Sequence, residues 1–238
     1  PDSDKPLNLS TCACILAKAD LPTDPSTCAE DKKDATEVVV RPYTPISTNA
    51  QTGSFDLLVK HYPNGLMSKH VKTMPVGATL EFKHIDFNVK LQAPFKQKNI
   101  GMIVGGTGIT PMIQALHAIL GDETNDIKVS MLYGSKISGD ILGEEMLTKW
   151  TANYGDSFSV THVLSDESES SEWKGERGYI TEPLIREKLP SPVLGDDAII
   201  FVCGPPPMYE ALCGPRGESE IKGVLADMGY KKNQVYKF

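Results

Sequence analysis

The chain of 238 residues carries 24 basic and 31 acidic residues, for a formal net charge of −7, and 40% of its residues are hydrophobic. These values indicate a soluble globular protein with room for two small domains. They argue against nucleic acid as a partner, because no large basic excess is interleaved with aromatic residues. No segment has the roughly 18 consecutive apolar residues needed to span a membrane.

The charge is unevenly distributed along the chain. Residues 36–100 hold 8 basic and 4 acidic side chains, whereas the segments before and after them are net acidic. A cationic middle segment in an acidic protein can steer an acidic partner onto that segment. Uneven solvation of two faces is an equally good interpretation of the charge alone.

Up to about residue 98, short β-type runs are separated by Pro, Gly, Asn and Asp, which predicts an antiparallel barrel or sandwich. The expected strands cover residues 12–17, 36–40, 54–62, 78–82 and 87–92. We interpret residues 1–98 as an antiparallel six-stranded β-barrel domain whose N-terminal strands are missing. The acidic run over residues 21–35 is expected to be a loop.

From residue 99 onward, apolar strands alternate with helical patterns, which predicts a doubly wound, mostly parallel sheet over residues 99–238. The expected strands are residues 100–104, 127–133, 157–164 and 198–203, with a closing run at 234–238. The expected helices are residues 111–120 and 140–154, one from Thr181, and one near 218–228. The predicted fold class is therefore a β domain followed by an α/β domain.

Two unusual turns follow apolar strands in this second part. In GGTGITPM (105–112), the glycines permit a tight turn, and Pro111 suits the first helical turn, where free N–H groups can bind an anion. In CGPPPM (203–208), Cys203 precedes a rigid proline lip at a strand end, where open α/β sheets bind ligands. Each segment alone is also compatible with an ordinary turn, and Cys203 with an ordinary buried thiol.

Two segments of the first part carry polar groups in a similar setting. RPYTPIS (41–47) offers the Arg41 guanidinium for a phosphate, the ring and hydroxyl of Tyr43, and the small donor Thr44. KHYPNGLMSKHV (60–71) turns at Gly65 into a helix that Ser68 is expected to cap, with free N–H groups suited to a diphosphate. Taken alone, residues 41–47 are also compatible with a stiff turn, and residues 60–71 are also compatible with an ordinary capped helix.

The order of these segments is more specific than any one of them. RPYTPIS, Gly65-Leu66-Met67-Ser68, GGTGITPM, CGPPPM and the C-terminal Phe238 together resemble the cytochrome-b5 reductase group of the ferredoxin–NADP reductase superfamily. The resemblance implies an enzyme that takes a hydride from NADH onto bound FAD and passes electrons singly to a haem protein, with no metal site. Such chemistry mainly requires that two cofactor rings be positioned against each other.

The resemblance also implies roles for individual residues. Arg41 is implied to pair with the FAD diphosphate, Tyr43 to face the flavin, and Thr44 to donate its hydroxyl to flavin N5. Other implied contacts on the FAD side are Pro42, Leu58, Lys60, Tyr62, Gly65, Met67 and Ser68. Those on the nicotinamide side are Gly106, Thr107, Gly108, Thr110, Pro111, Cys203, Gly204, Pro205, Pro206 and Met208. The implied catalytic residues are Thr44, Lys60 and Cys203.

The expected nucleotide is NADH rather than NADPH. NADPH-using relatives typically place a Ser-Arg pair after the third strand of this domain, and Leu164-Ser165-Asp166-Glu167 stands there instead. Acidic groups at this position repel the 2′-phosphate of NADPH. Lys136, after the second strand, partly offsets this argument.

The implied electron acceptor is cytochrome b5 or a similar acidic haem protein, met by basic side chains of the first domain. The candidates are Lys69, Lys72, Lys83, Lys96 and Lys98. The implied protein is a cytoplasmic monomer, attached to the endoplasmic reticulum or mitochondrial outer membrane through an anchor absent from this chain. The alternatives are the reductase module of a larger enzyme such as nitrate reductase, and a non-catalytic nucleotide-binding redox sensor.

Overall fold

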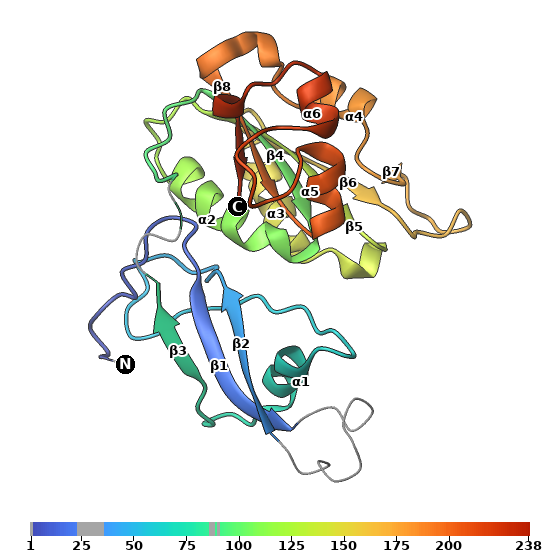
Figure 1. Ribbon diagram of the computed structural model, residues 1–238. Coiled ribbons are helices and arrows are strands. Elements are labelled where there is room, and N and C mark those ends of the chain that lie inside the picture. Colours follow the sequence, from blue (N-terminus) through green and yellow to red (C-terminus); the bar gives the residue numbers. More distant parts are fainter. Residues whose placement is uncertain (1, 23–35, 86–88, 90) are drawn as a thin grey trace.

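The computed structural model describes residues 2–22, 36–85, 89 and 91–238. These residues form an antiparallel sheet of three strands and a parallel sheet of six strands. The two sheets lie one beside the other, each with its own helices (Figure 1). The predicted fold class, a β part followed by an α/β part, is confirmed.

The antiparallel sheet has the order β2-β1-β3. It consists of β1 (Ile15–Pro22), β2 (Thr36–Tyr43) and β3 (Glu81–His84). The valines of β2 favour a strand, because branched side chains suit a pleated surface. Helix α1 (Leu66–Thr73) packs on this sheet, where Met67 is buried among Ala17, Leu21 and Val39.

This part of the chain differs from the prediction at the start of β1, which is Ile15 rather than residue 12, and at residues 54–62. Residues 54–62 do not form a strand: Ile46 donates to Asp56 O at 2.8 Å, but no continuous ladder follows. An extended segment becomes a strand only when a neighbouring strand pairs with it, and the described residues supply none there. Of the expected strand over 87–92, residues 89, 91 and 92 are described and do not lie in a strand, and its other residues lie outside the described part of the chain. Most of the expected loop over 21–35 also lies outside it.

The parallel sheet has the order β7-β6-β5-β4-β8-β9. Its strands are β4 (Asn99–Gly105), β5 (Lys128–Ser135), β6 (Phe158–Leu164), β7 (Glu176–Arg177), β8 (Ala198–Cys203) and β9 (Val235–Lys237). The neighbouring strands β4 and β8 are in register from Asn99↔Ala198 to Val104↔Cys203. The carboxyl ends of both strands therefore meet at one edge of the sheet.

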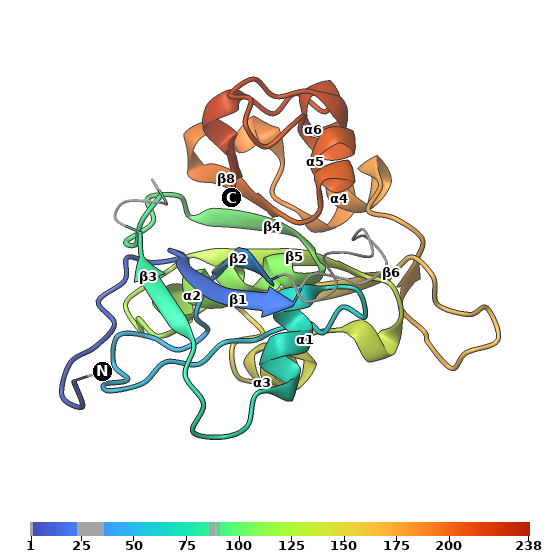
Figure 2. The ribbon, with the colours of Figure 1, turned by 60° about the horizontal axis from the view of Figure 1, so that its bottom comes forward.

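Helices cover both faces of this sheet. Helices α2 (Ile109–Leu120) and α3 (Glu144–Asn153) bury one face, and α4 (Glu182–Lys188), α5 (Pro206–Leu212) and α6 (Gly223–Asp227) bury the other. Seen from the antiparallel-sheet side, α4, α5 and α6 lie together above β4 (Figure 2). The described part of the chain also contains short 3₁₀ turns: η2 (Gly106–Gly108), η3 (Ser138–Asp140), η4 (Pro192–Asp197) and η5 (Lys232–Gln234).

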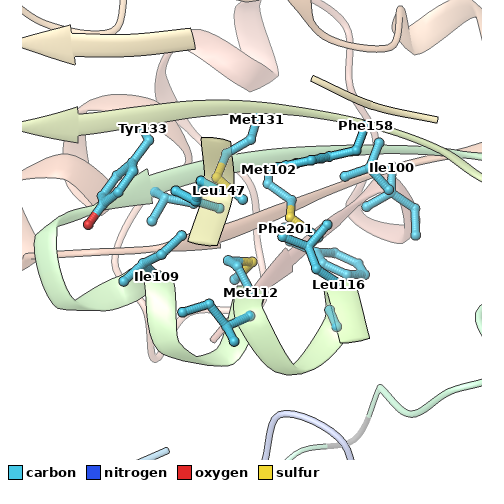
Figure 3. Packing of buried hydrophobic residues seen from close by; sticks show 14 of the residues in the cluster. Ile100, Met102, Ile109, Met112, Leu116, Met131, Tyr133, Leu147, Phe158 and Phe201 are labelled. Atoms are coloured by element: carbon cyan, nitrogen blue, oxygen red, sulfur yellow. The ribbon is translucent and has the colours of Figure 1, made fainter. Parts of the chain in front are cut away.

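The strand residues alternate between the two faces, as the period of two requires. Met102 and Val104 of β4 lie in the cluster under α2, together with Met131 and Phe201, whereas Ile103 lies in the cluster under α5. Figure 3 shows the first cluster, with Met112 and Leu116 of α2 pointing at the strand side chains. Because both faces are covered, the inner strands β4 and β8 are almost continuously apolar, which is why they could be predicted from the sequence.

Two predicted helices differ in extent, and one helix was not predicted. α3 begins at Glu144 rather than at residue 140, and α6 is limited to Gly223–Asp227. The proline lip continues directly into α5, whose first residues are Pro206 and Pro207. Proline is favoured in the first helical turn because its missing N–H has no partner there.

Candidate functional site

A large cleft lies between the two sheets, and residues of both line it. Its volume is about 1520 Å³, larger than the roughly 300–1,000 Å³ usual for a single small ligand. It is lined by the end of β2, by residues between Leu58 and Ser68, by the turn after β4, and by the proline-rich turn after β8 (203–208). Of the site residues predicted from sequence, Pro206 alone does not line this cleft, and Pro207 lines it instead.

Arg41, Tyr43 and Thr44 line the cleft at the end of β2. Arg41 is exposed, and its Nη1 donates to the backbone oxygen of Val40 at 2.8 Å. Burial raises the pKa of the half-buried Tyr43 hydroxyl, and the nearby Arg41 charge opposes that effect. The guanidinium therefore keeps donors for an anionic ligand, beside a neutral aromatic side chain.

The start of α1 also lies on the cleft. The helix begins at Leu66, and Gly65 precedes it with no side-chain cap. Ser68, expected to cap this helix, instead donates to the backbone oxygens of Tyr62 and Gly65 at 3.2 and 3.0 Å. The Ser68 hydroxyl thus fixes the turn, while backbone N–H groups at the helix start remain for a ligand.

Lys60 and Tyr62 lie where the cleft passes from one sheet to the other. The Lys60 ammonium forms an ion pair with Asp140 of η3 at 3.0 Å and lies 6.0 Å from the centre of the Tyr62 ring. Asp140 was not predicted from the sequence. It follows β5 by only a few residues, and nothing in its local pattern distinguishes it from a solvated loop carboxylate.

On the parallel-sheet side, the turn after β4 forms the floor of the cleft. Gly106 has φ +52°, in the left-handed region that favours glycine, and a Cβ built there would meet no atom within 4 Å. Thr110 is buried, and its hydroxyl donates to Thr107 O at 3.2 Å. The main chain at Gly106 is therefore open to a ligand, and the Thr110 bond fixes the turn around it.

The lip after β8 faces this turn. Burial raises the pKa of the Cys203 thiol to about 11, although a hydrogen bond with Tyr209 and the charge of Arg216 act in the opposite direction. The thiol is thus neutral near pH 7 and can pack against a ring, but it is a poor nucleophile. Arg216 also lines the cleft, and no local pattern in the sequence distinguishes it.

The far end of the cleft is lined by Ser135, Lys136, Ser165 and Asp166, which follow β5 and β6. Two backbone hydrogen bonds join the segments: Ser165 N donates to Ser135 O at 3.0 Å, and Asp166 N donates to Lys136 O at 2.8 Å. A cation and a carboxylate therefore both stand at the position where the sequence argument placed nucleotide discrimination.

These features fit two dinucleotides. The β2 side offers a guanidinium and an uncapped helix start, both suited to a diphosphate, and the parallel sheet offers an open glycine turn at its carboxyl edge. The two sides share one cleft, so ligands bound to them would meet near Lys60, Gly106 and Cys203. Within the described residues, no group of three or more His, Cys, Asp or Glu side chains is placed to hold a metal ion.

Known protein families match both parts of the chain. Residues 28–105 match the oxidoreductase FAD-binding domain and residues 102–214 the oxidoreductase NAD-binding domain. The fold and these matches define an oxidoreductase that binds a flavin and a nicotinamide nucleotide.

Individual relatives narrow this class. NADH-cytochrome b5 reductase 2 of Scheffersomyces stipitis is 40% identical over 84% of this chain and 67% of its own length. That of Yarrowia lipolytica is 37% identical over 100% of this chain and 78% of its own length. The cytochrome b5 reductase domain of Ulva prolifera nitrate reductase superposes with a TM-score of 0.81 at 26% identity, covering 99% of this chain and 87% of that domain.

The chain belongs to the NADH-cytochrome b5 reductase family of the ferredoxin–NADP reductase superfamily. It spans 62–67% of the length of five fungal relatives of that name. In the described part of the chain, no helix has the length and apolar character needed to cross a bilayer.

Proposed function

We propose that this chain transfers a hydride from NADH to FAD and passes single electrons to cytochrome b5 or a similar acidic haem protein. Residues 1–98 would form the FAD-binding domain and residues 99–238 the NADH-binding domain. The observation that carries the proposal is one cleft lined by Arg41 and the start of α1 on one side and by the Gly106 turn and Cys203 on the other.

The residues that line the cleft have positioning tasks in this reaction. The chemistry that bound FAD supplies is the conversion of a two-electron hydride into single electrons. Arg41 and the N–H groups of α1 would bind the FAD diphosphate, and Tyr43 and Thr44 would orient the flavin ring. The nicotinamide ring would be held against the flavin ring by the Gly106 turn, Cys203 and the prolines that follow it. Hydride transfer depends more on this close contact between the rings than on an acid or base.

The simplest test is spectroscopic. The purified protein with FAD should be yellow, and NADH added without oxygen should bleach it. NADPH should act at least tenfold more slowly if Asp166 repels the 2′-phosphate, a penalty of about 1.4 kcal/mol or more. A protein that holds FAD but is not bleached by NADH would refute the proposed reaction, and equal rates would refute the nucleotide preference.

The proposed acceptor site is the edge of the cleft beside α1. Lys69 and Lys72 are exposed on the helix whose first residues line the cleft, so their charges suit an acidic haem edge. Lys98 is a poorer candidate, because it pairs with Asp126 at 2.7 Å. This pair lies before the start of β4, at the end of the strand opposite the cleft.

The Lys69→Glu/Lys72→Glu variant should slow cytochrome b5 reduction and flatten its salt dependence while leaving bleaching by NADH unchanged. The exposed Lys188→Glu variant, on α4, is the control.

The runner-up is the reductase module of a larger enzyme. It is supported by the similarity to the nitrate reductase domain of Ulva prolifera, which covers 99% of this chain. The same reaction in the cleft is expected for a separate cytochrome b5 reductase and for a reductase module. The coding sequence upstream of residue 1 would therefore distinguish the two. A fused haem or molybdenum domain would favour the larger enzyme.

We further propose that the protein is a monomer that works at the cytosolic surface of a membrane.

A further inference from the structure

One ion pair crosses the cleft from one sheet to the other. Lys60 belongs to the segment between β2 and α1, and Asp140 ends η3 on the parallel-sheet side. Their side chains are 18% and 29% exposed, whereas every other ion pair seen among the described residues has both partners at least 39% exposed. An exposed pair contributes little, but a shielded pair can hold its partners in place.

Hydrogen bonds of residues before and after Asp140 fix the loop that carries it. Ser138 N donates to the Glu167 carboxylate at 2.6 Å, and Asp140 N donates to Ile137 O at 3.0 Å. Two residues further on, Leu142 N donates to the hydroxyl of Tyr133 at 3.2 Å. The Asp140 carboxylate therefore stands on a fixed loop, where it can act as an anchor for a mobile partner.

The same hydroxyl connects this loop to the floor of the cleft. The Tyr133 hydroxyl donates to Gly106 O at 3.1 Å, within the turn proposed to face the nicotinamide. Tyr133 lies at the edge of the buried cluster, with its hydroxyl turned away from the other labelled side chains (Figure 3). The loop of Asp140 and the turn of Gly106 are thus fixed to one common group.

Lys60, by contrast, forms no second ion pair with the described residues. The Lys60 ammonium lies at the outer limit of a cation–π contact with Tyr62, 6.0 Å from the ring centre. A lysine side chain has many accessible rotamers. If it must be ordered when a ligand binds, part of the entropic cost is subtracted from the affinity.

We propose that Asp140 is a positioning residue that presents the Lys60 ammonium to the nicotinamide nucleotide at the junction of the two cofactors. This inference rests on the proposed function of the cleft. Asp140 does not touch the reacting atoms; it holds Lys60 in the cleft before the nucleotide arrives. Its loss should therefore weaken nucleotide binding and leave the chemical step largely intact.

The decisive experiment compares Asp140→Asn, Asp140→Glu and Glu145→Gln with the unmodified chain, all loaded with FAD. Asn keeps the size of the side chain but removes its charge, and Glu keeps the charge. Glu145 pairs with Lys149 in an exposed i,i+4 pair on α3 and is the matched control. The readouts are the affinity for NAD⁺ by calorimetry, the flavin reduction rate at saturating NADH, and the acetylation rate of Lys60 by mass spectrometry.

We expect Asp140→Asn to weaken NAD⁺ binding by about 5- to 20-fold, less than the complete loss of a charge-assisted contact, because Lys60 itself remains. The saturating reduction rate should stay within about twofold, and Lys60 should be acetylated several-fold faster. Asp140→Glu should recover most of the affinity, and Glu145→Gln should change nothing. Wild-type affinity and wild-type Lys60 reactivity in Asp140→Asn would overturn the inference.

A double-substitution cycle separates positioning from a general structural role. If Asp140 acts through Lys60, Asp140→Asn should have no further effect on NAD⁺ affinity in the Lys60→Met background. An equal loss in both backgrounds would overturn the inference. Acetylation of Lys60 needs no nucleotide, so this readout tests the pairing even if NADH fails to bleach the protein, an outcome that would refute only the proposed reaction.

Discussion

The main chain of Gly108 lies directly against the carbonyl group of Cys203. A Cβ built on Gly108 would overlap that carbonyl and would lie 3.1 Å from Gly204 N. The glycine turn after β4 and the proline lip after β8 therefore touch through their backbones, as the register Val104↔Cys203 requires. This contact forms the parallel-sheet wall of the cleft, and only glycine fits at position 108.

The first prediction follows from this contact. Gly108→Ala must push the two segments apart, and overpacking of this kind costs about 1–3 kcal/mol. We expect a lower urea midpoint of unfolding and weaker NADH binding, with FAD retained because the β2 side is untouched. Gly139→Ala is the control for the unfolding midpoint, since a Cβ there meets nothing within 4 Å. A Gly108→Ala protein with the midpoint and NADH affinity of the parent would contradict the contact.

The contact also illustrates what sequence could and could not predict. The strands β4 and β8 were predictable, because a strand covered on both faces must be almost wholly apolar. The position of the two turns on a cleft was predictable, because open α/β sheets bind ligands at the carboxyl ends of their strands, although each turn alone also fits an ordinary turn. Their backbone contact was not predictable, since it depends on the register of strands about a hundred residues apart.

The antiparallel part was less predictable for a physical reason. Residues 54–62 have the composition of a strand, but strand formation needs a partner, and the described residues provide none. The start of β1 at Ile15 was also missed, because Cys12 has φ +63° and cannot continue a strand. Asp140 and Tyr133 were missed because their roles arise from contacts between loops, which leave no local pattern.

A second prediction concerns Tyr133. Its pKa is raised by burial, so the hydroxyl stays protonated, and it both accepts from Leu142 N and donates to Gly106 O. Tyr133→Phe keeps the ring and leaves the Leu142 N–H without this acceptor, which costs about 1–3 kcal/mol when the group is shielded from water. Urea unfolding should detect the loss, together with a weaker affinity for NADH.

The control for Tyr133 is Tyr154→Phe, a partly exposed tyrosine at the end of α3. It should change neither the midpoint nor the affinity. If Tyr133→Phe were as stable as the parent and bound NADH equally well, the hydroxyl would not be a support of the cleft.

A third prediction concerns the ionisation of Cys203. Because burial raises the pKa of this thiol from its ordinary value of 9 to about 11, the group remains protonated until the pH approaches 11. Only about 0.1% is thiolate at pH 8, and only the thiolate is an efficient nucleophile. Iodoacetamide should therefore alkylate Cys203 slowly at pH 8, and Cys203 should contribute no titration to the flavin reduction rate between pH 6 and 9.

Cys203→Ala completes this test. It should retain FAD but reduce the flavin about tenfold more slowly at saturating NADH, because a less tightly placed nicotinamide reacts less often. Cys213→Ala, another buried thiol outside the cleft lining, should leave that rate unchanged. Normal reduction by Cys203→Ala would remove Cys203 from the active site.

The last prediction concerns the capture of FAD by Arg41. One N–H of its guanidinium is used by Val40 O at 2.8 Å, and four of its five donors remain for the ligand. Among the described residues Arg41 has no ion-pair partner, so its charge is not already neutralised. Arg41→Ala should weaken FAD binding by roughly 10- to 100-fold, the effect of losing about 1.5–3 kcal/mol of charge-assisted bonding.

The matched controls for Arg41 are Arg41→Lys and Arg186→Ala. Lysine keeps the charge but not the planar fork that matches a diphosphate, so its affinity should fall between those of the parent and Arg41→Ala. Arg186 pairs with Glu182 on the exposed side of α4, and its loss should leave FAD binding unchanged. The ratio of flavin absorbance to protein after gel filtration measures all three. A yellow Arg41→Ala protein with full FAD content would show that the diphosphate is held by the start of α1 alone.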